Sequence, residues 1–196
     1  MSECRDRIVH DFARWTALSA LRSGAHVKSR ADVYPLLDQV PFEDVLLGSQ
    51  PITSAEFDDW HKATTESLCA RDPRVVVGWG SKMINVYLKT AGYVGRMGRP
   101  GLKESLHPPI DRGLWDGLRK RFRGQTAILD EACCVGQIKD ICEYATYCRI
   151  IKGCRMAAEE LGCLLIEVEQ LWLGSVTPGV KHRDHRTGAL DARSGQ

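Results

Sequence analysis

Two short stretches of the chain place a reactive side chain beside backbone-restricting residues. They are residues 77–82 (VGWGSK) and residues 107–111 (HPPID). Gly78 and Gly80 permit φ > 0 and leave amide N–H groups uncovered, and a helix N-terminus presents unpaired N–H groups to an anion. The first stretch is therefore typical of a phosphate site, to which we assign Gly78, Gly80 and Ser81. A tight turn that only starts a helix is the alternative.

Lys82 is the candidate nucleophile of the first stretch. We expect it in the first turn of a helix that follows Gly80, where the positive end of the helix dipole disfavours a cation. An amine attacks only in its neutral form, so this place favours a nucleophilic lysine. Lys82, Asn85 and Lys89 recur at spacings of three and four and share one polar stripe, which a solvated surface would also explain.

Asp111 is the complementary candidate. We expect it in the first turn of a helix that Pro108 and Pro109 open. A helix N-terminus keeps a carboxylate ionised, so it is able to take up a proton or to stabilise a positive charge. The alternative is a first-turn aspartate that only stabilises its helix, by roughly 0.5 kcal/mol.

The positive charge of the chain lies in one block. Residues 82–123 hold ten Lys and Arg against three Asp and Glu, a net charge of +7, whereas the whole chain of 196 residues carries +2. Such a block suits a polyanion, because neutralised phosphates release counterions and give affinity that does not depend on sequence. Arg119 and Arg123 are candidate phosphate contacts, with a solvated helix face as the alternative.

The elements that position these residues are predicted to be helices, and the fold class to be all-α. Apolar residues recur at helical spacing in most of the chain, and no segment shows sustained alternation. The expected helices cover residues 5–21, 53–72, 81–94, 108–122, 137–161 and 164–173, and Thr53 with Glu56 forms a capping box. The β-like run 75–77 is equally explained by an isolated extended segment.

We expect one helical domain over residues 1–175 and a disordered tail at 176–196, where hydrophobic periodicity ends. In this domain the helices that carry Lys82 and Asp111 border one cleft. Composition excludes global disorder, since 43% of the residues are hydrophobic and 27% are charged. No apolar run approaches the roughly 20 residues that cross a bilayer, and the charged N-terminal residues do not resemble a secretory signal. We therefore expect a cytoplasmic protein that does not bind membranes.

The eight cysteines are predicted to be free buried thiols. From Cys142 onward their spacings are six, six and nine, and six helical residues turn by about 240°, so these side chains do not converge. Paired C-x-x-C units of a metal or iron–sulfur site are lacking. We accordingly assign no metal and no cofactor.

Gly78-Trp79-Gly80-Ser81-Lys82, followed by Pro109-Ile110-Asp111, resembles the helix-hairpin-helix DNA glycosylase superfamily, in which a G-x-G-x-K hairpin precedes a P-V-D motif. The 29-residue separation of Lys82 and Asp111, with the continuation through Lys89, is most similar to the archaeal 8-oxoguanine DNA glycosylase branch. The resemblance covers about residues 75–123. Asn85 departs from the pattern, because the hairpin helix usually packs a small apolar residue there.

The resemblance implies a glycosylase-like helical fold and a monomeric, nucleoid-associated protein that binds DNA in base-excision repair. In bifunctional members the lysine is the nucleophile and the aspartate assists. Lys82 would thus attack the sugar C1′ of a flipped nucleotide, and the Schiff base would collapse by strand-cleaving elimination. Trp172 is a candidate to stack on the base and Gln170 to read its edge, but a buried core tryptophan is the favoured interpretation of Trp172.

Two other functions remain open at the level of sequence. A non-catalytic helical module that binds nucleic acid needs only the basic block and the hairpin. A weaker similarity joins the segment to the helical enzymes of phage thymidine hypermodification, which would require a modified thymine and an amine donor. Covalent trapping of DNA through Lys82 separates an enzyme from a binding module.

Overall fold

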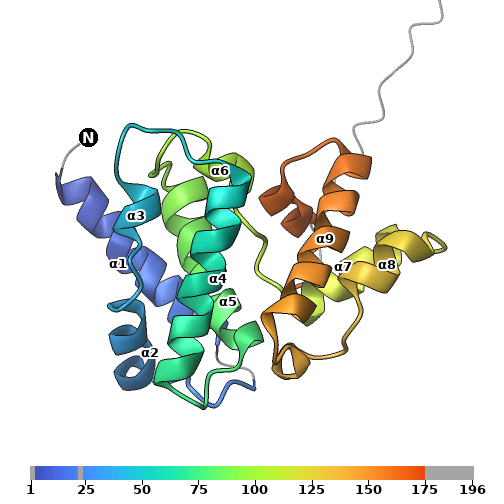
Figure 1. Ribbon diagram of the computed structural model, residues 1–196, viewed down its shortest axis with the longest axis horizontal. Coiled ribbons are helices and arrows are strands. Elements are labelled where there is room, and N and C mark those ends of the chain that lie inside the picture. Colours follow the sequence, from blue (N-terminus) through green and yellow to red (C-terminus); the bar gives the residue numbers. More distant parts are fainter. Residues whose placement is uncertain (1–2, 22–23, 175–196) are drawn as a thin grey trace, which may run out of the picture.

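A computed structural model describes residues 3–21 and 24–174, and these residues form helices and no strand, which confirms the all-α prediction (Figure 1). The expected tail at 176–196 lies outside the described residues. The longer helices are α1 (Glu3–Ala20), α2 (Arg30–Leu37), α4 (Ser54–Arg71), α5 (Val77–Leu88), α7 (Arg112–Arg121), α8 (Thr126–Ala132) and α9 (Tyr144–Leu161). The shorter elements are α3 (Glu43–Leu46), α6 (Leu102–Ser105), the π-helical η1 (Lys89–Val94) and the 3₁₀-helical η2 (Ile138–Asp140) and η3 (Leu165–Leu171).

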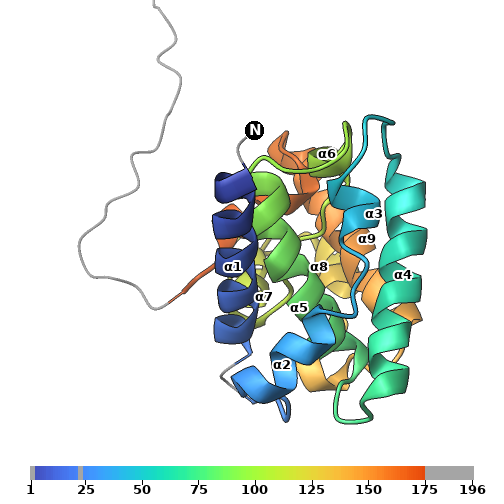
Figure 2. The same cartoon turned by 90° about the vertical axis from the view of Figure 1, so that its left-hand side faces the viewer.

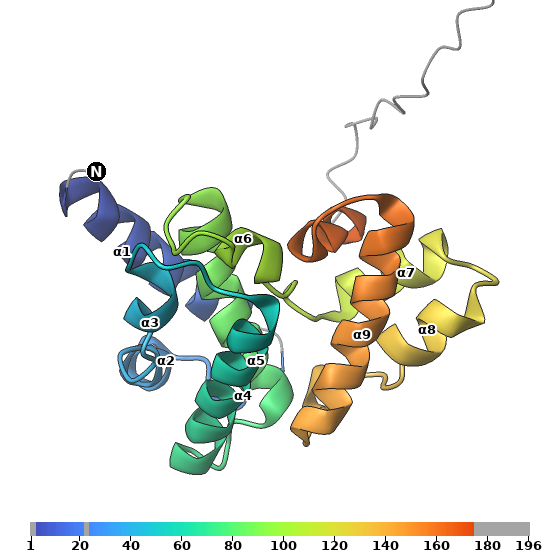
Figure 3. The same ribbon diagram turned by 45° about the horizontal axis from the view of Figure 1, so that its top comes forward.

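The helices gather in two groups, which lie side by side in Figure 1. We call α1 to α6 with η1 the N-lobe and α7 to α9 with η2 and η3 the C-lobe. Each lobe has its own hydrophobic cluster, centred on side chains such as Phe57 and Tyr87 in the N-lobe and Trp115 and Phe122 in the C-lobe. The segment 106–111 carries the chain from one lobe to the other (Figure 3).

The two lobes meet on α5. Figure 2 shows this helix between α1 and α4, and all twelve of its residues are buried. A helix that is buried on every side needs apolar or small residues around its circumference, which the sequence VGWGSKMINVYL largely supplies. Its first residue, Val77, packs in the C-lobe cluster, whereas Met83 and Leu88 pack in the N-lobe cluster.

Several helix boundaries differ from those predicted. α5 begins at Val77 instead of after Gly80, because Val76 is extended and caps the helix, so the β-like run leads into a helix. α7 begins after Asp111 instead of at the prolines, since the buried segment 106–110 is extended between the lobes. The predicted helix 137–161 divides into η2 and α9, and the last helix is 3₁₀-helical.

The predicted capping box at the start of α4 is confirmed. The Glu56 amide donates to the Thr53 Oγ1 at 3.2 Å, and the Thr53 amide donates to the Glu56 carboxylate at 2.7 Å. Two orphan amides at the helix start are thereby satisfied. Within residues 3–21 and 24–174, no helix has both the length and the hydropathy that crossing a bilayer requires.

Candidate active site

Lys82 and Asp111 meet where the two lobes join. The Lys82 Nζ lies 3.3 Å from the Asp111 Oδ2, although 29 residues separate the two positions. Lys82 comes from α5 and Asp111 from the residue that precedes α7. The expectation that both side chains face one cleft is thus confirmed. Their side chains are 7% and 21% exposed, so the pair is largely withdrawn from solvent yet reachable.

Asp111 is held by donors from two directions. It is the N-cap of α7 and not a first-turn residue as expected, and its Oδ1 accepts from the Leu114 amide at 3.0 Å. The same oxygen accepts from the Trp172 indole Nε1 at 2.9 Å. Two N–H donors on one oxygen require an acceptor there and leave Oδ2 to Lys82. The carboxylate is therefore oriented before any substrate binds.

Lys82 itself stands deeper in its helix than expected. It is the sixth residue of α5, in the second turn, because the helix already begins at Val77. The end of the helix dipole therefore acts on it less than a first-turn position would allow, since that effect falls off within the first turn. What singles Lys82 out is its burial against the Asp111 carboxylate, and its Nζ also lies 5.8 Å from the centre of a Trp79 ring.

Lys82 and Asp111 border a groove between the lobes. Its volume is about 930 Å³, and Trp79 and Trp172 form part of its walls. Arg112 and Lys139 stand at the groove as well, and the Arg112 side chain is 91% exposed. Asp116 lines the groove too and lies 3.6 Å from the Arg112 guanidinium, so the groove combines a buried amine–carboxylate pair with two basic side chains and one acidic side chain.

A second hollow of about 450 Å³ also reaches Lys82 and Asp111. Lys89 and Glu169 line it, and the Lys89 Nζ lies 2.6 Å from the Glu169 Oε1. Trp172 lines both hollows, as Lys82 and Asp111 do. Two lysine–carboxylate pairs therefore face this space. The spacing of the polar residues predicts that Lys89 shares a stripe with Lys82. No pattern in the sequence points to Glu169 as its partner, because the two residues are 80 positions apart.

Trp172 is not a core residue, since 47% of its surface is exposed. The interpretation of Trp172 as a buried core tryptophan is therefore wrong. Gln170 shares a third hollow of about 670 Å³ with Trp172, Lys89 and Glu169, but neither Lys82 nor Asp111 lines that space. The structure therefore brings Trp172 to the amine–carboxylate pair and does not bring Gln170 there.

The expected phosphate cradle is not formed by Gly78, Gly80 and Ser81, all of which are buried. The Gly78 amide donates to the Ile141 carbonyl at 2.9 Å, and the Gly80 amide donates to the Val76 carbonyl at 3.0 Å. Neither glycine has a positive φ. A Cβ at Gly78 would lie 2.2 Å from the Ile138 carbonyl oxygen, so this glycine allows the lobes to approach closely.

Arg119 and Arg123 are exposed, as the phosphate hypothesis requires, but neither lines the groove. The Arg119 guanidinium lies 3.3 Å from the carboxylate of Asp116, and Asp116 is the residue that lines the groove. Arg99, from the same basic block, donates instead to the backbone carbonyls of Asp44, Gln50 and Pro51. The basic block is thus divided: Arg99 binds backbone carbonyls within the N-lobe, whereas Arg119 and Arg123 face outward.

The polar stripe of α5 does not face solvent. Asn85 is 1% exposed and Lys82 is 6% exposed, which excludes the solvated surface as an explanation for these two positions. The stripe points toward the junction of the lobes because α5 is enclosed by both of them. Asn85 occupies a fully hydrogen-bonded site, considered below.

The eight cysteines are free thiols, but Cys154 alone among them is buried, and Cys4, Cys142 and Cys148 are exposed. Burial raises the pKa of Cys154 to about 12. The prediction of buried thiols is therefore wrong for most of the eight. Helical periodicity assigns a cysteine to the apolar face without showing whether another element covers that face.

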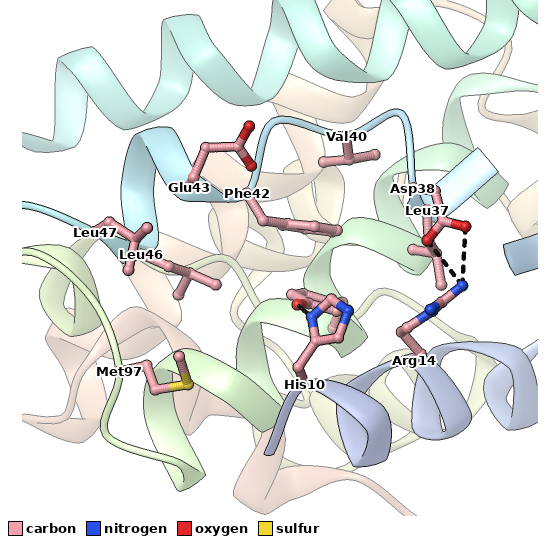
Figure 4. A pocket seen from close by; sticks show the side chains of 11 residues that line it. His10, Arg14, Leu37, Asp38, Val40, Phe42, Glu43, Leu46, Leu47 and Met97 are labelled. Carbon is pink, nitrogen blue, oxygen red and sulfur yellow. Dashed lines mark hydrogen bonds and ion pairs between the residues drawn. The ribbon is translucent and has the colours of Figure 1, made fainter. Parts of the chain in front are cut away.

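A separate hollow of about 300 Å³ lies between α1 and α3 (Figure 4). Two pairs of its polar side chains already interact, because Arg14 bridges to Asp38 and the His10 ring bonds to the Tyr87 hydroxyl. Apolar side chains such as Phe42 and Leu46 form much of the remaining wall. We therefore assign the candidate active site to the Lys82 groove.

Comparison of the chain with known protein families, curated proteins and solved structures finds no match.

Proposed function

We propose that the chain is a DNA glycosylase with lyase activity, of the helix-hairpin-helix type. The observation that carries this proposal is the 3.3 Å approach of the Lys82 Nζ to the Asp111 Oδ2 at the wall of a groove that Arg112 and Lys139 also line. A buried amine beside an oriented carboxylate suits nucleophilic attack with proton transfer. DNA is the proposed partner, bound by a monomer associated with the nucleoid.

The chemistry follows from the pair. Asp111 takes a proton from the Lys82 ammonium, and the neutral amine attacks C1′ as the bond from C1′ to the base nitrogen breaks. The departing base receives that proton, so Asp111 is again a carboxylate beside the positive charge, which now lies on the Lys82 nitrogen bound to C1′. Opening of the sugar ring gives the Schiff base, which borohydride reduces to a stable amine. In the lyase step, C2′ of the Schiff base loses a proton, a double bond forms between C2′ and C3′, and the 3′ phosphate leaves.

The hollow that Lys89 and Glu169 line is the proposed base pocket. A nucleotide whose C1′ lies at Lys82 has its base within reach of this space, because Lys82 and Asp111 line it too. Trp172 offers a flat face for stacking, while the Lys89 ammonium and the Glu169 carboxylate offer a donor and an acceptor for a base edge. Gln170, in the neighbouring hollow, has no role in this proposal.

Phosphate contacts are assigned to the exposed basic side chains in place of the glycine amides. Arg112 and Lys139 stand at the groove, and Arg119 and Arg123 follow along and beyond α7. The flexible ends of these side chains suit non-specific backbone contacts, which supply most of the affinity for DNA.

Borohydride trapping on a panel of duplexes that carry damaged or modified bases, with an abasic duplex alongside, tests the proposal. We expect a covalent adduct with wild type and none with Lys82→Gln, which keeps the length and polarity of the side chain. If wild type binds DNA but forms no adduct with any duplex, the chain is a non-catalytic binding module. An adduct that persists in Lys82→Gln would assign the chemistry to another amine.

A further inference from the structure

A buried network of polar side chains lies directly behind the Lys82–Asp111 pair. It joins Asp58 and His61 of α4, Asn85 of α5, His107 of the inter-lobe segment, and Tyr144, Tyr147 and Arg155 of α9. Between 0% and 7% of the surface of His61, Asn85, His107, Tyr144 and Tyr147 is exposed. Both lobes therefore share one set of hydrogen bonds where they meet.

The bonds of this network have a consistent direction. The Asn85 Nδ2 donates to the Tyr147 hydroxyl at 2.8 Å and to the Pro108 carbonyl at 3.2 Å, which leaves Oδ1 to accept from the His61 Nε2 at 2.9 Å. His61 is then a neutral ring whose Nδ1 accepts from the Tyr144 hydroxyl at 2.7 Å. Asn85 thus uses its donors and its acceptor at once, so its amide is fixed in one orientation.

Asn85 connects the two halves of the active site. It lies one helical turn after Lys82 on α5, and the carbonyl that it holds belongs to Pro108, three residues before Asp111. The Tyr147 hydroxyl supports the same connection, because it contacts Asn85 on one side and the His107 Nδ1, at 3.0 Å, on the other. A displacement of the segment 107–110 would move the N-cap of α7 and hence the Asp111 carboxylate.

We propose that Asn85 and Tyr147 are positioning residues that set the distance between the nucleophile and its carboxylate by fixing the segment 107–110 against α5. Tyr144 belongs to the same network, but its hydroxyl bonds to the His61 ring and approaches the Asp58 carbonyl at 3.5 Å instead of bonding to that segment. The inference rests on the proposed function for its kinetic consequence, but its structural content can be measured without DNA.

The two tyrosines make a matched pair of variants. Tyr147→Phe and Tyr144→Phe each remove one hydroxyl from α9 and one or two buried hydrogen bonds, but only the first loosens the segment that leads to Asp111. Because the Trp172 Nε1 donates to Asp111, its indole N–H resonance reports the position of that carboxylate in the free protein. Trp172→Phe assigns the resonance. We expect Tyr147→Phe to shift it and Tyr144→Phe to leave it in place.

Trapping on an abasic duplex at saturating protein gives the kinetic readout. We expect Tyr147→Phe and Asn85→Leu to slow adduct formation by about tenfold or more, since small misplacements of reacting groups are costly, while Tyr144→Phe stays within about twofold of wild type. The dissociation constant for DNA should not change in any of them. Asn85→Leu removes several buried bonds, and if it fails to fold, Tyr147→Phe decides.

Two results would overturn the inference: an unmoved Trp172 resonance in Tyr147→Phe, or equal shifts and equal rate losses in both tyrosine variants. The second result would mean that the network acts only through stability. If wild type traps no DNA, the proposed function fails, and the resonance still decides whether Asn85 and Tyr147 position Asp111.

Discussion

At the scale of single residues, Lys82 in α5 and Lys89, which begins η1 directly after α5, have separable tasks. On an abasic duplex there is no base to remove, so we expect Lys89→Gln to trap at the wild-type rate while Lys82→Gln traps nothing. On a duplex with an intact target base we expect both variants to lose excision, because the Lys89–Glu169 pair lines the proposed base pocket. Trapping and product formation on the two duplexes check this.

Should Lys89→Gln lose trapping on the abasic duplex as well, the assignment of the nucleophile to Lys82 alone would be wrong. Should it excise the base at the wild-type rate, the base pocket would have to lie in the larger groove instead.

The two buried histidines predict how stability depends on pH. Burial lowers the pKa of His61 and of His107, whose hydrogen bond to Asp58 offsets only part of the effect. Unfolded histidines titrate near 6.5, so below that pH the unfolded chain binds protons that the folded chain does not. We expect the free energy of unfolding to fall between pH 7.5 and 5.5, by up to about 1.4 kcal/mol per pH unit for each histidine.

Urea denaturation across this range measures the slope of the free energy of unfolding against pH. His61→Gln should reduce this slope by the amount that corresponds to about one bound proton. The titration of Asp58 does not contribute to this slope between pH 7.5 and 5.5. Burial alone would raise its pKa, but the hydrogen bond from His107 and the ion pair with Arg155 outweigh that and lower it, so its contribution is lost only at more acidic pH. An equal slope in wild type and His61→Gln would contradict the prediction.

At the scale of elements, α7 accommodates the C-terminal segment through its glycines. A Cβ at Gly117 would lie 1.8 Å from the Leu171 carbonyl oxygen, and the Gly113 carbonyl accepts from the Leu173 amide at 3.0 Å. Gly117→Ala must therefore push the segment away, which also displaces Trp172 from Asp111. We expect a loss of stability of about 1–3 kcal/mol from overpacking, although Ala is the better helix former.

Thermal unfolding and the Trp172 indole resonance measure both consequences of Gly117→Ala. Gly136→Ala is the control, because a Cβ at Gly136 meets nothing within 4 Å and the residue has no positive φ. If Gly117→Ala is as stable as Gly136→Ala, η3 and the residues after it do not depend on close approach to α7.

At the scale of the whole molecule, the distribution of the basic residues predicts the salt dependence of binding. Each phosphate contact that is lost lowers the slope of log affinity against log salt by about one. We expect Arg119→Ala and Arg123→Ala each to do so, with trapping intact at saturating protein. Arg99→Ala is the matched control from the same block, because its guanidinium binds backbone carbonyls within the N-lobe.

Arg99→Ala should lower the melting temperature and leave the salt slope unchanged, as DNA titrations at several salt concentrations would show. The reverse outcome, a reduced slope in Arg99→Ala and none in the other two, would place the DNA on the opposite side of the molecule.

Much of the helical content followed from local sequence, since spacing and capping act over a few residues. The helices around Trp15, Trp60, Leu88 and Trp115 and the capping box at Thr53 were predictable for that reason. The short helices α2, α3, α6 and α8 were missed, because four to eight residues carry too little periodicity to stand out.

The candidate pair Lys82 and Asp111 was predictable from a motif, but its geometry was not. The motif identifies two candidate side chains, whereas their 3.3 Å separation depends on how α5 and α7 are held by the segment between them. Glu169 and the network around Asn85 had no signal at all, because their partners lie 23 to 80 residues away and come from other helices.

The sequence by itself thus determined the helical class and the two candidate residues Lys82 and Asp111, and the tertiary structure decided which polar groups face solvent. Gly78 and Gly80 illustrate the difference. By local sequence alone, both glycines could expose their amides to a phosphate. In the folded chain the C-lobe packs against α5 and covers both residues, and the Gly78 amide donates to the Ile141 carbonyl. Whether a small residue is a ligand site or a contact point depends on which element approaches it, and that is a property of the folded chain.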